Sequence, residues 1–220
     1  MNPRKKQIIH AAHRLFVEKG FTSTSIQDIL DEARISKGTF YNHFTSKNEC
    51  LMAIIESVSE EADQQRREIA LGKRRDDLEV FAAQIAVRMK VNREHNLVAL
   101  FESVLYSKDE ELKAFVKKQH MFEVQWTAER ITEIFGPSSR RYALDQAVML
   151  LGMIHHLMNI WLLGSKQEIN SDRAIWFALD RLKPMMEDQI QSNEAFFPED
   201  WLVLSTNWPE MNMAEMKERL

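Results

Sequence analysis

Apolar residues recur at intervals of three and four residues along almost the whole of this 220-residue chain. That spacing lines them up on one face of an α-helix, because a helix turns once every 3.6 residues. The alternating Val, Ile and Thr runs that form strands are lacking, and only six glycines and five prolines interrupt the pattern. The sequence therefore predicts an all-α fold.

The first residues predict two helices separated by a glycine. Helical periodicity covers about residues 4–19, and Gly20 follows it at a position where helices commonly end. Thr24 is expected to cap a short second helix, with Gln27 completing a capping box three residues later.

The next segment predicts a third and a fourth helix. Ser36 is expected to cap a helix over residues 37–44, and Ser46 or Thr45 is expected to cap one that continues to about residue 71. Because the turn between the second and third helices is short, the first three helices have the layout of a helix-turn-helix domain.

The rest of the chain predicts a larger helical body. We expect a helix-turn-helix head over residues 1–47 and a body over residues 48–220. The body includes an additional segment from about residue 194, in which Pro198 and Pro209 start turns. Helical periodicity in the body covers about residues 77–92, 95–106, 109–135, 140–164 and 172–192.

The expected third helix carries the prediction of DNA binding. Phe40 and Phe44 lie one turn apart and should face the core, which leaves Gly38 and Asn42 pointing outward. Glycine lets a backbone approach the floor of a groove, and an asparagine amide can bond adenine. Side chains that can donate to bases or phosphates border this ridge: Lys37, Thr39, Tyr41, His43 and, at the start of the fourth helix, Lys47.

Residues 4–51 resemble the DNA-binding domain of the tetracycline-repressor (TetR) family. The resemblance rests on residues at fixed spacing: Phe16, Gly20-Phe21, Thr24-Ser25-Ile26, Asp28-Ile29, Ala33, the run from Ile35 to Phe44, Ser46-Lys47 and Leu51. It implies that phosphates are contacted by Thr24, Thr39, Tyr41, His43 and Lys47, and that bases are faced by Gln27, Lys37, Gly38 and Asn42. Arg34 departs from the pattern, since the family often has glycine at this turn.

The resemblance implies a ligand-responsive transcription repressor that binds a pseudo-palindromic operator on double-stranded DNA as a homodimer. Charge agrees with it: the chain carries a net charge of −4, yet residues 1–47 hold eight Lys and Arg against four Asp and Glu. An activator or a ligand-independent regulator is the alternative. An enzyme is less expected, because the chain has no phosphate-binding loop, hydrolase or zinc-protease motif. An interaction protein that uses the head without DNA is also less expected.

The body predicts a subunit interface. Residues 146–164 are apolar almost all round, and a soluble helix of that kind must be covered on every side. With a second apolar face over residues 174–186, it is expected to form a four-helix bundle with a second copy. Polar residues interrupt the run, which argues against a membrane span. A lone cysteine, Cys50, and the lack of a signal peptide favour the cytoplasm.

The effector is expected to be a largely apolar molecule with one or two polar groups, because aromatic, methionine and isolated polar side chains occur within apolar stretches of the body. The candidate lining residues are Phe101, Glu102, Met121, Phe122, Gln125, Trp126, Met153, His156 and Asn159. No cofactor and no metal is expected, since the adjacent His155 and His156 diverge on a helix.

Overall fold

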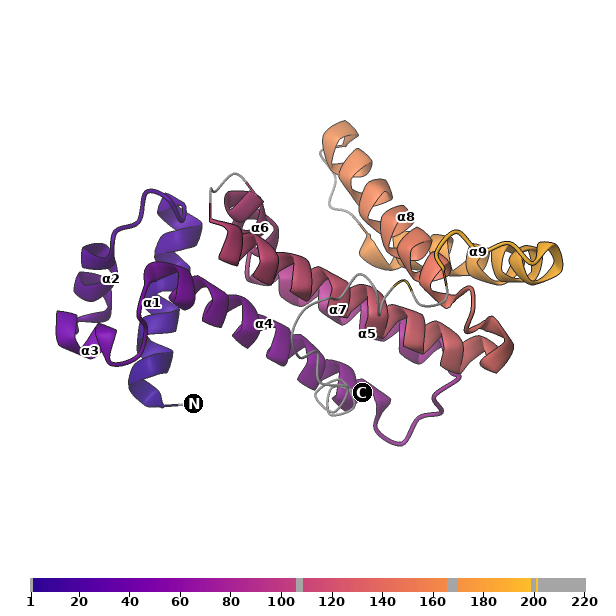
Figure 1. The fold of residues 1–220 in the computed structure, drawn as a ribbon, viewed down its shortest axis with the longest axis horizontal. Coiled ribbons are helices and arrows are strands. Elements are labelled where there is room, and N and C mark those ends of the chain that lie inside the picture. The colour runs from indigo at the N-terminus through magenta and orange to yellow at the C-terminus, as the bar shows by residue number, and fades with distance from the viewer. Residues whose placement is uncertain (1, 106–108, 166–169, 199–200, 202–220) are drawn as a thin grey trace. The chain divides into compact units, whose positions relative to one another are not determined.

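The computed structural model describes residues 2–105, 109–165, 170–198 and 201, which form helices and connecting turns with no strand in these ranges. The expected all-α fold is therefore confirmed. The elements in chain order (Figure 1) are α1 (Pro3–Lys19), α2 (Ile26–Ala33), α3 (Lys37–Tyr41), α4 (Lys47–Ala70), α5 (Leu78–Glu94), α6 (Leu97–Leu105), α7 (Glu110–Phe135), the 3-10 turn η1 (Pro137–Ser139), α8 (Ala143–Gly164) and α9 (Ser171–Ser192).

The start of α2 differs from the expectation by one residue. Ser25, not Thr24, is the N-cap: its hydroxyl accepts from the Asp28 amide at 3.1 Å, and the Asp28 carboxylate accepts from the Ser25 amide at 2.8 Å. Thr24 is buried, and its hydroxyl donates to the Gly20 carbonyl at 2.8 Å. The capping box therefore joins Ser25 to Asp28 rather than Thr24 to Gln27, because Thr24 bonds to the end of α1.

The described chain forms two compact units. One comprises Met1–Ala62 with Lys90–Gln119, and the other comprises Asp63–Met89 with His120–Leu220. The first unit thus extends beyond the head expected over residues 1–47, because α1 packs against α6. Helices α4, α5 and α7 each contribute residues to both units.

The first unit has a core of large apolar side chains supplied by α1 to α4. Ile8, Ile29, Phe40, Phe44 and Leu51 are all fully buried. In the same unit, the rings of His13 and His95 stack with centroids 5.4 Å apart, and His13 Nε2 lies 2.8 Å from the His95 carbonyl oxygen. Burial lowers the pKa of His13 from its ordinary value.

The second unit has its own core, in which α8 and α9 pack against each other and against the ends of α5 and α7 (Figure 1). Phe81 of α5, Ile131 of α7, Leu150 of α8 and Leu182 of α9 are buried in it. This burial accounts for one face of α8 and one face of α9.

The residues that follow α9 are tied to the body by Asp145, a buried carboxylate on α8. Its Oδ2 accepts from the Phe196 amide at 2.7 Å and from Gln189 Nε2 at 2.8 Å. Its Oδ1 accepts from the Phe197 amide at 3.1 Å. Pro198 lies one residue beyond this anchor, whereas Pro209 falls outside the described residues.

Candidate DNA interface

The turn between α2 and α3 is set by two residues. Arg34 has φ 50° and ψ 50°, a left-handed conformation that costs a non-glycine residue roughly 1 kcal/mol. Ser36 then caps α3 as expected, because its hydroxyl accepts from the Thr39 amide at 3.1 Å. The turn therefore fixes the direction in which α3 leaves α2, although arginine stands where glycine would be unstrained.

The inner face of α3 is aromatic. Phe40 and Phe44 are 0% and 1% exposed, and their ring centroids lie 5.8 Å apart. Tyr41 packs edge-on against Phe40, with centroids 5.5 Å apart, yet remains 45% exposed. The helix itself ends at Tyr41 and not at Phe44, where it was expected to end, and the chain continues through turns to Phe44.

The outer face of α3 carries the expected ridge. Lys37, Gly38 and Asn42 are exposed, and Thr39 and His43 are half-buried at its flanks. A Cβ added at Gly38 would meet only the Ser36 hydroxyl oxygen, at 3.8 Å, which is an ordinary contact. Packing within the described protein therefore does not require glycine at this position, and a close approach by a ligand such as DNA would explain it.

Two of the residues expected to contact DNA lie outside α3, on the segment that opens α2. Gln27 is exposed, and its Nε2 donates to Asp31 Oδ1 at 2.8 Å. Thr24 is 1% exposed, and its hydroxyl donates to carbonyls of α1 and Gly20. The geometry thus keeps Gln27 among the candidate contacts and places the Thr24 side chain inside the domain.

Lys47 lies at the start of α4, where the Ser46 hydroxyl accepts from the Glu49 amide at 3.1 Å and acts as the cap. The Lys47 ammonium donates to the carbonyls of Phe21 and Thr24, both at 2.7 Å. Burial lowers its pKa from the ordinary value for lysine. In this structure Lys47 therefore holds the loop between α1 and α2, and its contact with a phosphate stays a prediction.

The sequence did not single out Lys5, which the structure brings close to Phe44, just beyond the end of α3. Its ammonium lies 5.2 Å from the centroid of the Phe44 ring. The signal was the basic run Arg4-Lys5-Lys6 at the start of α1. This run adds positive charge to the head that carries the ridge.

Comparison with known proteins identifies the family. Residues 8–54 match the family described as bacterial regulatory proteins, tetR family. The chain is also 30% identical over 192 residues to the HTH-type transcriptional regulator YerO of Bacillus subtilis. This alignment covers 85% of the chain and 66% of YerO, so the chain spans just under two thirds of that relative's length. The chain belongs to the TetR family. The relatives that it matches are helix-turn-helix transcriptional regulators, the class of protein that the sequence predicted.

Two solved structures share the TetR fold with this chain. A TetR-family regulator from Mesorhizobium loti superposes with a TM-score of 0.63 at 17% identity, covering 83% of this chain and 96% of that one. SmeT, the repressor of the Stenotrophomonas maltophilia multidrug efflux pump SmeDEF, superposes with a TM-score of 0.59 at 20% identity, covering 82% and 89%. At these identities the likeness concerns the fold.

The nine residues expected to line an effector site in this TetR-family chain are divided between the two units. Phe101 and Glu102 belong to one unit, and the other seven belong to the second. Those seven lie on α7 (Met121, Phe122, Gln125, Trp126) and on α8 (Met153, His156, Asn159). Glu102, His156 and Asn159 are exposed.

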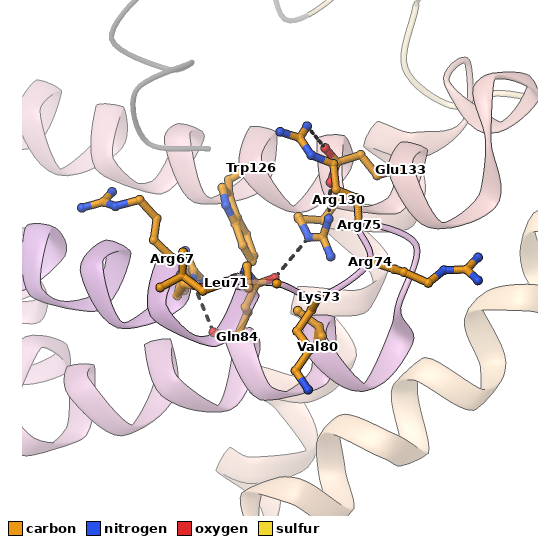
Figure 2. A pocket seen from close by; sticks show the side chains of 13 residues that line it. Arg67, Leu71, Lys73, Arg74, Arg75, Val80, Gln84, Trp126, Arg130 and Glu133 are labelled. Carbon is orange, nitrogen blue, oxygen red and sulfur yellow. Dashed lines mark hydrogen bonds and ion pairs between the residues drawn. The ribbon is translucent and has the colours of Figure 1, made fainter.

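A pocket of about 340 Å³ instead opens in the second unit, between the ends of α4, α5 and α7 (Figure 2). Of the nine expected residues, only Trp126 lines it. The lining residues were predicted from apolar stretches of the sequence. This pocket is instead built largely from arginine and lysine side chains contributed by helix ends and a connecting loop.

Proposed function

We propose that this TetR-family regulator is a repressor that binds a pseudo-palindromic operator and is released from it by a small ligand. The observation that carries the proposal is the exposed ridge of α3, in which Gly38 and Asn42 stand opposite the buried Phe40 and Phe44. An α-helix with such a ridge fits the major groove, where an amide can read adenine and a lysine can reach guanine. SmeT, which shares the fold, is a repressor.

A second copy of the chain is proposed to cover the outer faces of α8 and α9. Large apolar side chains are exposed there: Val148, Leu157, Ile160, Trp161, Leu162, Leu163, Trp176 and Phe177. By length and composition alone, α8 could also cross a membrane. His155, His156 and Asn159 would then lie in hydrocarbon, so we favour a subunit interface in a cytoplasmic homodimer.

Release by an effector is proposed to act through α4. This helix runs unbroken over Lys47–Ala70 and therefore begins at the DNA-binding head and ends in the second unit. A ligand that prefers one position of the Ala70 end of α4 would change the spacing between the two copies of α3 in a dimer. These two helices must enter successive major grooves, which lie about 34 Å apart. Coupling of about 1–3 kcal/mol is typical of such systems, and operator DNA must weaken ligand binding by the same factor.

The test is selection of bound sequences from random duplex DNA with the purified full chain. We expect an enriched pseudo-palindrome, and we expect the Asn42→Ala variant to lose preference at particular base pairs while keeping the fold. Gln191→Ala, at an exposed amide on α9 outside the ridge, is the matched control. A reporter joined to the enriched sequence then gives the sign: higher expression without the regulator supports a repressor, and lower expression supports an activator. Failure to enrich any sequence would contradict DNA recognition by α3.

A further inference from the structure

The pocket of the second unit is strongly cationic. Its lining contains six basic side chains and one acidic side chain, Glu133. The six are Arg66, Arg67, Lys73, Arg74, Arg75 and Arg130, contributed by α4, the loop that follows it, and α7 (Figure 2). So many cations around one hollow create a positive potential that favours a negatively charged occupant.

Acidic partners neutralise only part of this charge. Arg66 Nη1 donates to Glu123 at 3.1 Å, and Arg74 Nε donates to Asp76 at 2.8 Å. Arg75 and Arg130 share the single carboxylate of Glu133.

Arg67 and Lys73 form no ion pair with any acidic side chain in the part of the chain that the structure describes. In Figure 2 the charged ends of Arg67, Lys73 and Arg74 point in different directions around the pocket instead of toward a common protein partner. Two exposed cations at the opening are thus available to a ligand.

The rest of the pocket wall is apolar. Trp126 is one of the lining side chains (Figure 2), and the guanidinium carbon of Arg66 lies 3.6 Å from the centroid of its indole ring. Ala70, Leu71 and Val80 complete this wall, and Leu71 is 76% exposed although it is apolar. A ligand that covered Leu71 would therefore gain from apolar burial as well as from charge.

We infer that this pocket binds a small organic anion: a carboxylate, sulfonate or phosphate joined to an aromatic or aliphatic body. The anionic group is held by Arg67 and Lys73, whose long, exposed side chains turn toward it on binding, and the body lies against Trp126 and Leu71. The volume suits a small molecule, not a macromolecule. As the site of the effector, this pocket rests on the proposed function, and it replaces the expectation of a largely apolar effector with that of a charged one.

A matched pair of fluorescent probes tests the inference on the full-length protein without DNA. Anilinonaphthalenesulfonate carries an anionic group, and N-phenylnaphthylamine has the same rings without it. We expect saturable binding of the sulfonate that weakens as salt is raised, and binding of the neutral probe that is at least about tenfold weaker and insensitive to salt. Equal affinity for the two probes would overturn the inference.

Paired variants locate the site. Arg67→Gln with Lys73→Gln removes two exposed charges at the pocket and should weaken binding of the sulfonate at least about tenfold, leaving the neutral probe unchanged. Lys90→Gln with Lys117→Gln removes two exposed charges elsewhere and should leave both probes unchanged. An equal loss of sulfonate binding in both double variants would overturn the inference, because any loss of positive charge would then have the same effect. No loss in either variant would also overturn it, because a probe bound to the apolar face of α8 would be unaffected by both pairs of changes.

The role in regulation has a separate readout. The sulfonate should weaken binding of operator DNA to the wild type but not to the Arg67→Gln, Lys73→Gln variant. If the protein binds no operator, the proposed function fails while the probe result still stands. If DNA binds and the probes show no preference for charge, the inference fails and DNA recognition stands.

Discussion

Lys47 is bound to Phe21 in two ways: its ammonium donates to the Phe21 carbonyl oxygen at 2.7 Å and lies 4.5 Å from the centroid of the Phe21 ring. The first residue of α4 thus fastens the loop that joins α1 to α2. A residue expected to contact DNA also stabilises the domain that presents the reading helix, so the two roles must be measured separately.

Lys47→Ala is expected to lower the free energy of unfolding by about 1–3 kcal/mol, because it removes charge-assisted hydrogen bonds to two carbonyls. Urea unfolding measures this, with Lys37→Ala, an exposed lysine of α3, as the control that should leave stability unchanged. DNA binding is then measured well below the melting temperature of the variant, where it is folded. If Lys47 also contacts a phosphate, the variant binds all DNA sequences more weakly, and its affinity depends less steeply on salt concentration. An unchanged salt dependence would remove Lys47 from the interface.

Gly38→Ala separates folding from DNA recognition. The added methyl group meets only the Ser36 hydroxyl oxygen at 3.8 Å, and alanine favours a helix over glycine by up to about 1 kcal/mol. Thermal unfolding should therefore show equal or higher stability, whereas operator affinity should fall because the methyl group stands between the backbone and the base edges. Undiminished affinity for the selected operator would show that α3 does not approach DNA through Gly38.

Ile160→Glu is expected to convert a dimer into monomers and abolish operator binding with little change in helical content. Ile160 is 54% exposed on α8, so a charge there is tolerated in a single chain but not in an apolar interface. Light scattering at micromolar concentration measures the mass. Val98→Glu, at a side chain that is 58% exposed on α6, is the control. A charge at Ile154, also on α8, would not test the interface, because that side chain is 3% exposed and lies in the core of the single chain. A wild-type mass of one chain would contradict the proposed interface.

Glu123→Gln is expected to destabilise the second unit by about 3 kcal/mol at pH 7, because it leaves the buried Arg66 and Arg88 facing a neutral amide. Burial raises the pKa of Glu123, but these two guanidiniums outweigh it and lower the pKa to about 2. The carboxylate therefore contributes stability above the ordinary glutamate pKa of about 4.3, and this contribution is lost as the pH falls toward 2.

Urea unfolding at several pH values measures this difference. The gap between wild type and Glu123→Gln should be full at pH 7 and should close as the pH falls below about 4. Glu79→Gln, at an exposed site on α5, is the control and should show a small gap throughout. A gap of the same size at pH 7 and below pH 3 would contradict the ionised state of Glu123.

Local signals made the helices predictable. Helices begin and end at residues that satisfy their own backbone groups, so Ser36 and Gly20 could be located from the sequence. The predicted position of the α2 cap was wrong by one residue, because Thr24 and Ser25 both carry a hydroxyl that could cap the helix. The choice depends on the bonds that the Thr24 hydroxyl donates to the carbonyls of Leu15 and Gly20, which spacing does not reveal.

The pocket was less predictable, because its residues come from helix ends that are distant in sequence. Lys73-Arg74-Arg75 has the composition of a solvated connector, and only the fold brings it to Arg130 and Trp126. The ridge of α3 could be predicted because Lys37, Gly38 and Asn42 lie on or directly at the end of one short helix, where spacing alone determines which of them share a face.

The bonds of Asp145 to Phe196 and Phe197 bear on where the chain can be shortened. The end of α9 suggests a truncation after Asn193. That truncation would remove the Phe196 and Phe197 amides, which donate to the Asp145 carboxylate, and would leave Gln189 as its donor. Asp145 is 4% exposed, so the loss of these hydrogen bonds would be costly. A shortened protein for crystallisation or spectroscopy should therefore retain Phe197. Hydrogen bonding to Asp145, and not the end of α9, therefore sets how far the chain can be shortened.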